Sequence, residues 1–380
     1  MGGRDLRRTR ARYIPAWVAI VALACAGAPA AYATNFTCSW NNGTANWATS
    51  ADWSSCNGTF PDNVSGNTYD ATISSGDPTL TTAVTIGSVV VNSPGQWDLA
   101  GPSGSATLTG TLANTGSVNL DFFGNQGGSS LSVGGTLTNT SSGTVQIGTS
   151  GGSLSATSTL SAAGLSNSGT IDLFGNASNP ANQANLTVTG PASNSGTVNI
   201  LSAGNLSVTG GGNTYAQTAG TTNILAGGTL SAPNINITGG TLQGNGTVAG
   251  NLNVSAAGTV QGDVPNTNTP ATMTVNGNYN QTGGTLAALL QGTGAGQVST
   301  INVGTGGVNL SGGVLQTNFA AGLIPAAGQT FNNVMTYAPG SLSGLFAALQ
   351  NGNGSLSANP TYLKSRRRSD FRGKLQPLRW

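Results

Sequence analysis

Apolar residues alternate with polar ones in short runs along most of the chain, and glycine, serine or asparagine separates the runs. Four segments share one template, roughly L-x-V-x-G-x-L-x-N-x-G-T-V-x-I, at residues 106–120, 131–147, 154–173 and 186–200. Its anchor residues, Val118, Val145, Ile171 and Val198, are 27, 26 and 27 residues apart. A repeat of this length with a two-residue alternation indicates short β-strands in stacked units. The glycine and β-branched content disfavours helix.

Each repeat carries three short apolar groups, which predicts three strands separated by turns in one triangular coil. Coils stacked ~4.8 Å apart satisfy each other's backbone groups. We therefore predict an all-β fold, a right-handed parallel β-helix, whose repeats occupy residues 84–318. Because alternate side chains of a strand point to opposite faces, one outward column is expected to contain Asn119, Gln146, Asp172, Asn199 and Asn223.

Four asparagines share one turn position of the template: Asn114, Asn139, Asn167 and Asn194. Asparagine tolerates the left-handed backbone conformation that sharp turns require. Stacked identical amides can also hydrogen-bond to one another along the stacking axis. We predict a structural asparagine ladder made of these four side chains.

The beginning of the chain differs from the repeats. Five arginines precede an apolar run and the small-x-small site Ala31-Tyr32-Ala33, which predicts that residues 1–33 are a secretory signal peptide. Residues 34–83 are expected to form an N-terminal cap, in which three tryptophans build a local core rather than a ligand cage. Cys38 and Cys56 are predicted to form a disulfide, as is typical of an even pair in an exported chain. Metal binding by this pair is the less favoured alternative.

The end of the chain also departs from the repeats. Residues 319–350 contain larger apolar side chains, and we expect them to form a C-terminal cap over the last strands. Residues 351–380 contain seven of the twelve lysines and arginines of the chain. We interpret this segment as a basic tail that is either disordered or not native sequence.

Charge narrows the classes of function. Residues 34–363 contain no Lys, Arg, His or Glu, and their eight aspartates give them a charge of −8. Without cations this body cannot neutralise phosphates, so no nucleic-acid partner is predicted. This body has no histidine for imidazole-based catalysis and no lysine for Ser-Lys catalysis. No metal and no cofactor are predicted, because the aspartates are scattered and do not follow the repeated glycine–aspartate pattern of calcium-binding solenoids.

Two segments carry a resemblance to a known family. "WNNGTANWATSADWSSCNGTFPDNVSGNTYDATISSG" (40–76) and "GLIPAAGQTFNNVMTYAPGSLSGLF" (322–346) resemble passenger regions of Gram-negative autotransporters and related β-helical surface proteins. The resemblance implies export and display or release at the cell surface, commonly with adhesive or matrix roles. Unlike a complete autotransporter, this sequence shows no translocator barrel after residue 350, so the outer-membrane translocator is unknown.

The leading hypothesis is an exported, non-enzymatic structural or adhesive protein of the cell surface or extracellular space, with the periplasm as an alternative location. Two other readings stay open: an Asp-dependent carbohydrate-active enzyme on the same scaffold, and the passive stalk of a truncated autotransporter. The expected partner of the leading hypothesis is a host-surface, matrix or carbohydrate ligand.

Two insertions interrupt the repeats and are the candidate ligand-binding loops. "LDFFGNQGGSS" (120–130) and "LFGNASNPANQA" (173–184) each place phenylalanine beside Gly-Asn. The side chains of Phe122, Phe123 and Phe174 either form an exposed patch on one flank or are buried beneath their own loops.

Overall fold

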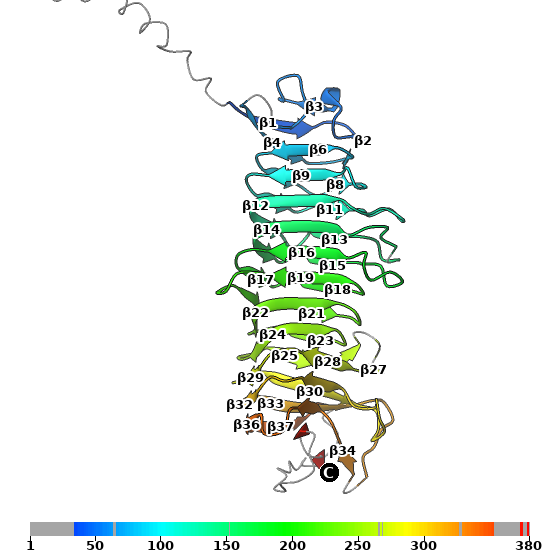
Figure 1. The fold of residues 1–380 in the computed structure, drawn as a ribbon, viewed down its shortest axis with the longest axis vertical. Helices are drawn as coiled ribbons and strands as arrows, with labels where there is room; N and C mark the ends of the chain where they lie inside the picture. The colour runs from blue at the N-terminus through cyan, green and yellow to red at the C-terminus, as the bar shows by residue number, and fades with distance from the viewer. Residues whose placement is uncertain are drawn as a thin grey trace, which may run out of the picture.

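The computed structural model describes residues 34–63, 66–151, 153–264, 267, 269–326, 329–352, 373–374 and 378–379. Its regular elements in this part of the chain are strands, apart from one 3-10 helix, η2 (Ser50–Asp52). The strands stack along one long axis, so the molecule is elongated (Figure 1). The predicted signal peptide lies outside the described residues, as does most of the predicted tail.

Most strands belong to three columns, in which each strand pairs in parallel with its counterparts in the neighbouring repeats. Column 1 contains β6 (Ala83–Ile86), β9 (Ser105–Leu108), β16 (Ala184–Val188), β19 (Gly204–Val208), β28 (Thr272–Val275), β31 (Thr300–Val303) and β35 (Met335–Tyr337). Column 2 contains β1 (Asn35–Trp40), β4 (Thr68–Ile73), β7 (Val89–Val91), β10 (Leu112–Asn114), β17 (Ala192–Asn194), β20 (Thr214–Gln217), β29 (Tyr279–Gln281), β32 (Val308–Leu310) and β36 (Leu342–Gly344).

Four longer strands join these two columns into one 22-stranded sheet. They are β12 (Ser130–Asn139), β14 (Ser158–Asn167), β22 (Thr229–Ile237) and β24 (Thr247–Val254). Their first halves lie in column 1 and their second halves in column 2. The pairing of β12 with β14 shifts register between Val133 and Thr136, at the point where the chain passes from one column to the other.

Column 3 is a separate 13-stranded parallel sheet. It contains β2 (Thr44–Asn46), β5 (Asp77–Leu80), β8 (Gln96–Leu99), β11 (Ser117–Leu120), β13 (Thr144–Ile147), β15 (Thr170–Leu173), β18 (Thr197–Ile200), β21 (Thr221–Ile224), β23 (Thr241–Gly244), β25 (Thr259–Gln261), β30 (Thr285–Leu290), β33 (Val314–Phe319) and β37 (Ala348–Asn351). One passage of the chain through columns 1, 2 and 3 makes one repeat.

The hydrophobic alternation sets the register of column 3. Val118 pairs with Val145, Val145 with Ile171, and Ile171 with Val198. All four side chains are completely buried, whereas the residue after each one lies on the outer surface or in a polar ladder. The predicted all-β, parallel architecture is therefore confirmed, and the interior between the columns is filled by the apolar residues of the template.

The parallel stack begins before the predicted start of the repeats. β1 pairs in parallel with β4, and β4 with β7, inside the segment expected to be a cap. The cap proper is smaller: β3 (Trp53–Ser54) folds back antiparallel on β1. Sequence reasoning set the boundary too late because these strands lack the template, although their alternation is regular.

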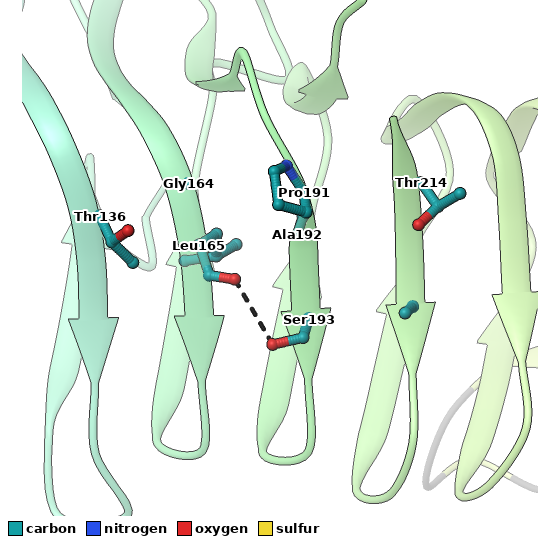
Figure 2. Close-up of a pocket in the computed structure, with 8 residues that line it drawn as sticks. Thr136, Gly164, Leu165, Pro191, Ala192, Ser193 and Thr214 are labelled. Atoms are coloured by element: carbon teal, nitrogen blue, oxygen red, sulfur yellow. Dashed lines mark hydrogen bonds between the residues drawn. The ribbon is translucent and has the colours of Figure 1, made fainter. Parts of the chain in front are cut away.

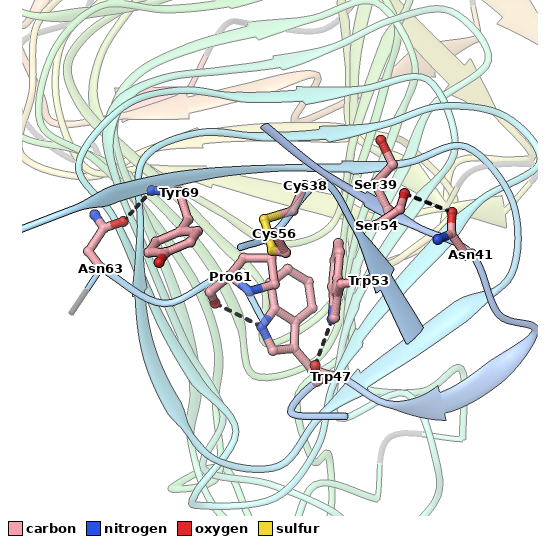
Figure 3. Close-up of a disulfide and its surroundings, with 10 residues drawn as sticks. All are labelled: Cys38, Ser39, Asn41, Trp47, Trp53, Ser54, Cys56, Pro61, Asn63 and Tyr69. Atoms are coloured by element: carbon pink, nitrogen blue, oxygen red, sulfur yellow. Dashed lines mark hydrogen bonds between the residues drawn. A yellow bond between two sulfur atoms is a disulfide. The ribbon is translucent and has the colours of Figure 1, made fainter. Parts of the chain in front are cut away.

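A tryptophan cluster and a disulfide close this end of the stack (Figure 3). Cys38 on β1 is bonded to Cys56, which confirms the predicted pairing. Trp47 packs edge-on against Trp53 and also contacts Trp97 of β8. The indole nitrogen of Trp47 donates to the Pro61 carbonyl oxygen over 3.1 Å. The tryptophans are thus buried core, as the sequence favoured.

The stack also continues beyond residue 318. β35, β36 and β37 pair in parallel with β31, β32 and β33, and so add a further repeat within the predicted C-terminal cap. Phe331 and Met335 fill its interior, which explains the larger apolar residues of this segment. Short antiparallel pairs complete the described fold: β26 (Asp263–Val264) with β27 (Thr269–Pro270), β34 (Thr330–Phe331) with β39 (Leu378–Arg379), and β38 (Gly373–Lys374) with β35.

Candidate functional site

Three long connections from column 3 to column 1 project from one edge of the stack, which we call the loop flank. They are residues 121–129 after β11, 148–157 after β13 and 174–183 after β15. Residue 152 is not described. The corresponding connection after β18 is only residues 201–203, which separates these three consecutive loops from the later long connections, such as residues 291–299 after β30.

Asp121 anchors the first loop of the flank. Its backbone is left-handed, with φ of 53°, and its carboxylate is completely buried. The carboxylate accepts hydrogen bonds from the Gly101 amide (2.7 Å), the Ser129 amide (2.9 Å), the Ser129 hydroxyl (2.9 Å) and the Ser158 hydroxyl (2.5 Å). These donors come from three successive repeats, so the carboxylate holds both ends of its loop to the repeats on either side.

The three loops also bind one another. The amide of Asn125 donates to the Ser153 hydroxyl over 3.3 Å, and the Ser155 amide donates to the Gln126 carbonyl over 2.9 Å. From the third loop, the side-chain amides of Asn176 and Asn182 both donate to the Leu154 carbonyl, over 2.8 and 2.9 Å. The middle loop therefore bridges the other two, a role that sequence reasoning missed because this loop has no aromatic residue.

The predicted loop phenylalanines do not share one environment. Phe122 and Phe123 are 41% and 50% exposed, and their rings meet edge-to-face with centroids 5.5 Å apart. Phe174 is only partly exposed. The aromatic surface of the flank is therefore formed mainly by the first loop, held in place by the carboxylate of Asp121.

The four predicted ladder asparagines lie at the ends of column 2 strands, where the chain turns into column 3. They pair in register from one repeat to the next. The Nδ2 atoms of Asn114, Asn139 and Asn167 donate to the Oδ1 atom of the following asparagine over 2.8, 2.8 and 2.7 Å, and the last acceptor is Asn194. These contacts form the continuous ladder expected from the repeat.

The backbone of these asparagines differs from the expectation. None of the four is among the residues with a left-handed conformation, and each side chain is at most 2% exposed. Their amides instead satisfy buried peptide groups of the turn: Asn139 also donates to the carbonyls of Gly143 and Thr170. The turn after Asn167 contains Gly169 because the backbones of neighbouring repeats approach closely there. A Cβ at Gly169 would collide with the Gly143 carbonyl oxygen.

Sequence reasoning did not recognise that Gln217 occupies the next position of this row and is linked to Asn194 through the Thr222 hydroxyl, which accepts from Asn194 over 3.4 Å. It pairs in register with Asn194, and its Nε2 donates to the Thr241 carbonyl over 2.8 Å. The Thr222 hydroxyl donates to its Oε1, and Tyr215 contacts the same hydroxyl. The sequence Tyr-x-Gln-Thr, which occurs at residues 215–218 and again at 279–282, was the available signal.

The outward-facing side chains of column 3 form a second ladder of hydrogen-bonded amides. Asn199 donates to Asp172 over 2.6 Å, and Asn223 donates to Asn199 over 2.6 Å. Gln146 departs from the series, because its amide turns to the Gly148 carbonyl. Burial raises the pKa of Asp172, and the hydrogen bond from Asn199 opposes that shift.

A carboxyl pair lies at the N-terminal end of the same row of column 3, beyond the break at Gln146. Asp98 is 2% exposed and accepts hydrogen bonds from Asn119 (2.8 Å) and from Gln96 (3.1 Å to each oxygen). Burial, together with the charge of the neighbouring Asp77, raises the pKa of Asp98 to about 6 against the opposing effect of the Asn119 hydrogen bond. Burial likewise raises the pKa of Asp77. No motif or short spacing indicates this pair, since 21 residues separate the two aspartates.

Two other aspartates also join neighbouring segments. Asp62 accepts the Thr85 amide over 2.8 Å, and Asp70 accepts the Ser88 amide over 2.6 Å. Among the described residues, no group of three or more His, Cys, Asp or Glu side chains is placed to hold a metal ion. These two aspartates thus act as structural acceptors, whereas the buried Oδ1 atoms of Asp77 and Asp263 have no hydrogen-bond partner within the described residues.

Two further findings concern relatives and membranes. Neither a family model nor a curated protein sequence matches this chain. No helix in the described ranges has the length and apolar content needed to cross a membrane.

Proposed function

We propose that the three-column stack is a right-handed parallel β-helix that is exported and serves as a non-enzymatic structural or adhesive protein at the cell surface or outside the cell. The extended shape, the regular polar ladders and the buried disulfide support this proposal, because disulfides persist in oxidising compartments. The predicted passenger-like sequence segments point in the same direction.

The observation that carries the adhesive role is the exposed Phe122–Phe123 pair. Among the described residues, the other large apolar side chains that are exposed are Ile324 and Leu345, near the opposite end. The pair sits on the first of three loops that hydrogen-bond to one another, so its position is fixed before any ligand binds. Exposed aromatic residues on a fixed surface bind ligands at a low cost in conformational entropy.

The charge of the body limits the class of partner. Residues 34–363 contain eight aspartates and no cationic side chain, so a polyanion is repelled. The flank offers backbone and side-chain amides around two aromatic rings. A carbohydrate or a neutral to basic protein of a host surface or matrix is therefore the class of partner that we propose.

The double variant Phe122→Ala/Phe123→Ala is expected to weaken ligand binding at least about tenfold, because aromatic anchors dominate such interfaces. The measurement is binding of the purified protein to a glycan array and to immobilised collagen, fibronectin and laminin. Leu345→Ala removes a similarly exposed apolar side chain away from the flank and is expected to bind normally. Equal binding by the double variant and the parent would refute the flank as the contact surface.

Export is tested by expressing the full chain in a Gram-negative host. The protein recovered from the periplasm or medium is expected to begin near Thr34 and to have Cys38 and Cys56 unreactive to maleimide until reduced. Reduction is expected to lower the free energy of unfolding by about 3 kcal/mol, as for other loops of this length. A chain found only in the cytoplasm with an intact N-terminus would contradict the exported role.

A further inference from the structure

A small pocket lies where column 1 passes into column 2, on a different edge of the stack from the loop flank. Its volume is about 230 Å³, and Thr136, Gly164, Pro191, Ser193, Thr214 and Ala216 are among its lining residues. Figure 2 shows Thr136 on β12, Gly164 on β14, Pro191 directly before β17, Ser193 on β17 and Thr214 on β20. The pocket therefore extends along the stacking axis, across four repeats.

The pocket exists because one repeat lacks a side chain. Thr136, Gly164, Pro191 and Thr214 occupy one outward row, each directly before a buried residue that pairs with its counterpart in the next repeat. Threonine or proline fills this row on either side of Gly164. The backbone of Gly164 is not left-handed, so its conformation does not require glycine. The absent side chain leaves a shallow depression there, because a Cβ at Gly164 would lie 3.1 Å from the Thr136 hydroxyl oxygen and 3.7 Å from the Pro191 carbonyl oxygen.

The lining combines free hydroxyl groups with small apolar surfaces. The hydroxyls of Thr136 and Thr214 form no hydrogen bond within the described residues, whereas the Ser193 hydroxyl makes a long one, 3.5 Å, to the Leu165 carbonyl (Figure 2). Pro191 and Ala216 supply apolar surface beside them. A sugar ring has the same division, with hydroxyl groups around its edge and C–H groups on its faces.

The size of the pocket and the absence of charge in its lining narrow the class of ligand further. The pocket is a shallow, open depression, smaller than the ~300–1,000 Å³ of pockets that enclose drug-sized molecules, so it offers contact to one ring rather than to a chain of rings. No lining residue is charged. An acidic sugar would find no cation here, and a metal or amine would find no carboxylate. A neutral saccharide leaves no charge unpaired in the pocket.

We propose that the depression at Gly164 is a binding subsite for a single neutral sugar ring, with the hydroxyls of Thr136 and Thr214 bonding its edge and Pro191 contacting its face. The subsite is separate from the loop flank. Its presence therefore does not depend on the adhesive role of Phe122 and Phe123, and the double alanine variant of that pair is expected to keep it.

The test uses the full-length protein and the methyl glycosides of glucose, galactose and mannose together with N-acetylglucosamine. Saturation-transfer NMR is expected to show saturable binding of at least one of these sugars. Gly164→Thr places a side chain in the depression and is expected to weaken that binding at least about tenfold. Because a Cβ at Gly164 would lie 3.1 Å from the Thr136 hydroxyl oxygen, that hydroxyl must rotate to accommodate it.

Two further variants keep the result interpretable. Gly43→Thr makes the same substitution at an exposed position with no neighbour within 4 Å, and it is expected to bind as the parent does. Thr136→Val/Thr214→Val preserves the shape and removes the two hydroxyls, and it is expected to bind several-fold more weakly. The proposal fails if no sugar gives a saturable signal, or if Gly164→Thr keeps the parental circular dichroism and also the parental affinity.

Discussion

Replacement of Asn139 by alanine is expected to lower the free energy of unfolding by about 3–5 kcal/mol, a large effect for a single polar residue. The Asn139 amide donates to Asn167, Gly143 and Thr170, and its oxygen accepts from Asn114. Alanine would leave these groups without their partner in a fully buried site. Each buried polar group without a partner costs about 1–3 kcal/mol.

The position of Asn139 within the stack adds to the loss of stability that its replacement causes. Repeats contact mainly their neighbours, so a weakened contact between two repeats limits the cooperativity of the whole array. Asn139 lies between Asn114 and Asn167, and its loss divides the ladder in two. The unfolding transition of Asn139→Ala is therefore expected to broaden as well as to shift.

Urea unfolding followed by circular dichroism, with hydrogen exchange of the turn amides, measures both effects. Thr138→Ala is the matched control, because Thr138 precedes Asn139 on β12 but points to solvent. It is expected to change stability by less than about 0.5 kcal/mol. A loss of similar size in both variants would show that the ladder contributes no more than the strand itself.

The ladder also shows what the sequence could predict. Four asparagines at one template position were sufficient to place them in one row, because the hydrophobic anchors fix the register. Their backbone conformation was not predictable in this way. Asparagine is common both in left-handed turns and at buried strand ends, and only the packing of neighbouring repeats decides between these two environments.

The limits of the stack and the loop flank were harder to predict for a related reason. β1 and β37 pair through backbone groups, which carry no sequence signature when the template is absent. Likewise, the buried role of Asp121 depends on donors 20, 8 and 37 residues away. Such contacts follow from the stacking register, so they become visible only once three repeats are placed together.

The Asp98 carboxyl makes the stability of the N-terminal end depend on pH. Its pKa is about 6 in the folded chain, against an ordinary value of 3.8, chiefly because the group is buried. A group whose pKa is higher in the folded state binds protons more tightly there, so protonation favours folding. Its contribution is complete below pH 4, declines as the pH rises, and is lost above about pH 6.

The expected size is about 3 kcal/mol between pH 4 and pH 7, from a difference of roughly two pKa units. Asp77 acts in the same direction, because burial also raises its pKa and its charge opposes ionisation of Asp98. The facing groups from β8 and β11 are the uncharged amides of Gln96 and Asn119. They reduce the penalty for ionisation but supply no countercharge.

Asp98→Asn is expected to remove most of this dependence and to raise stability at pH 7 by about 1–3 kcal/mol. The asparagine oxygen can still accept from Asn119, and its nitrogen can donate to Asp77, so the contacts of the ladder survive without a buried charge. Urea unfolding of parent and variant at pH 4 and pH 7 provides the comparison.

Asp52→Asn removes a carboxylate from η2, which contains no buried residue, and is expected to preserve the difference in stability between the two pH values. If Asp98→Asn were instead less stable than the parent at pH 7, the carboxylate would be stabilising in its charged form. Burial would then be the weaker effect at this site, and the amide donors of Gln96 and Asn119 the stronger one.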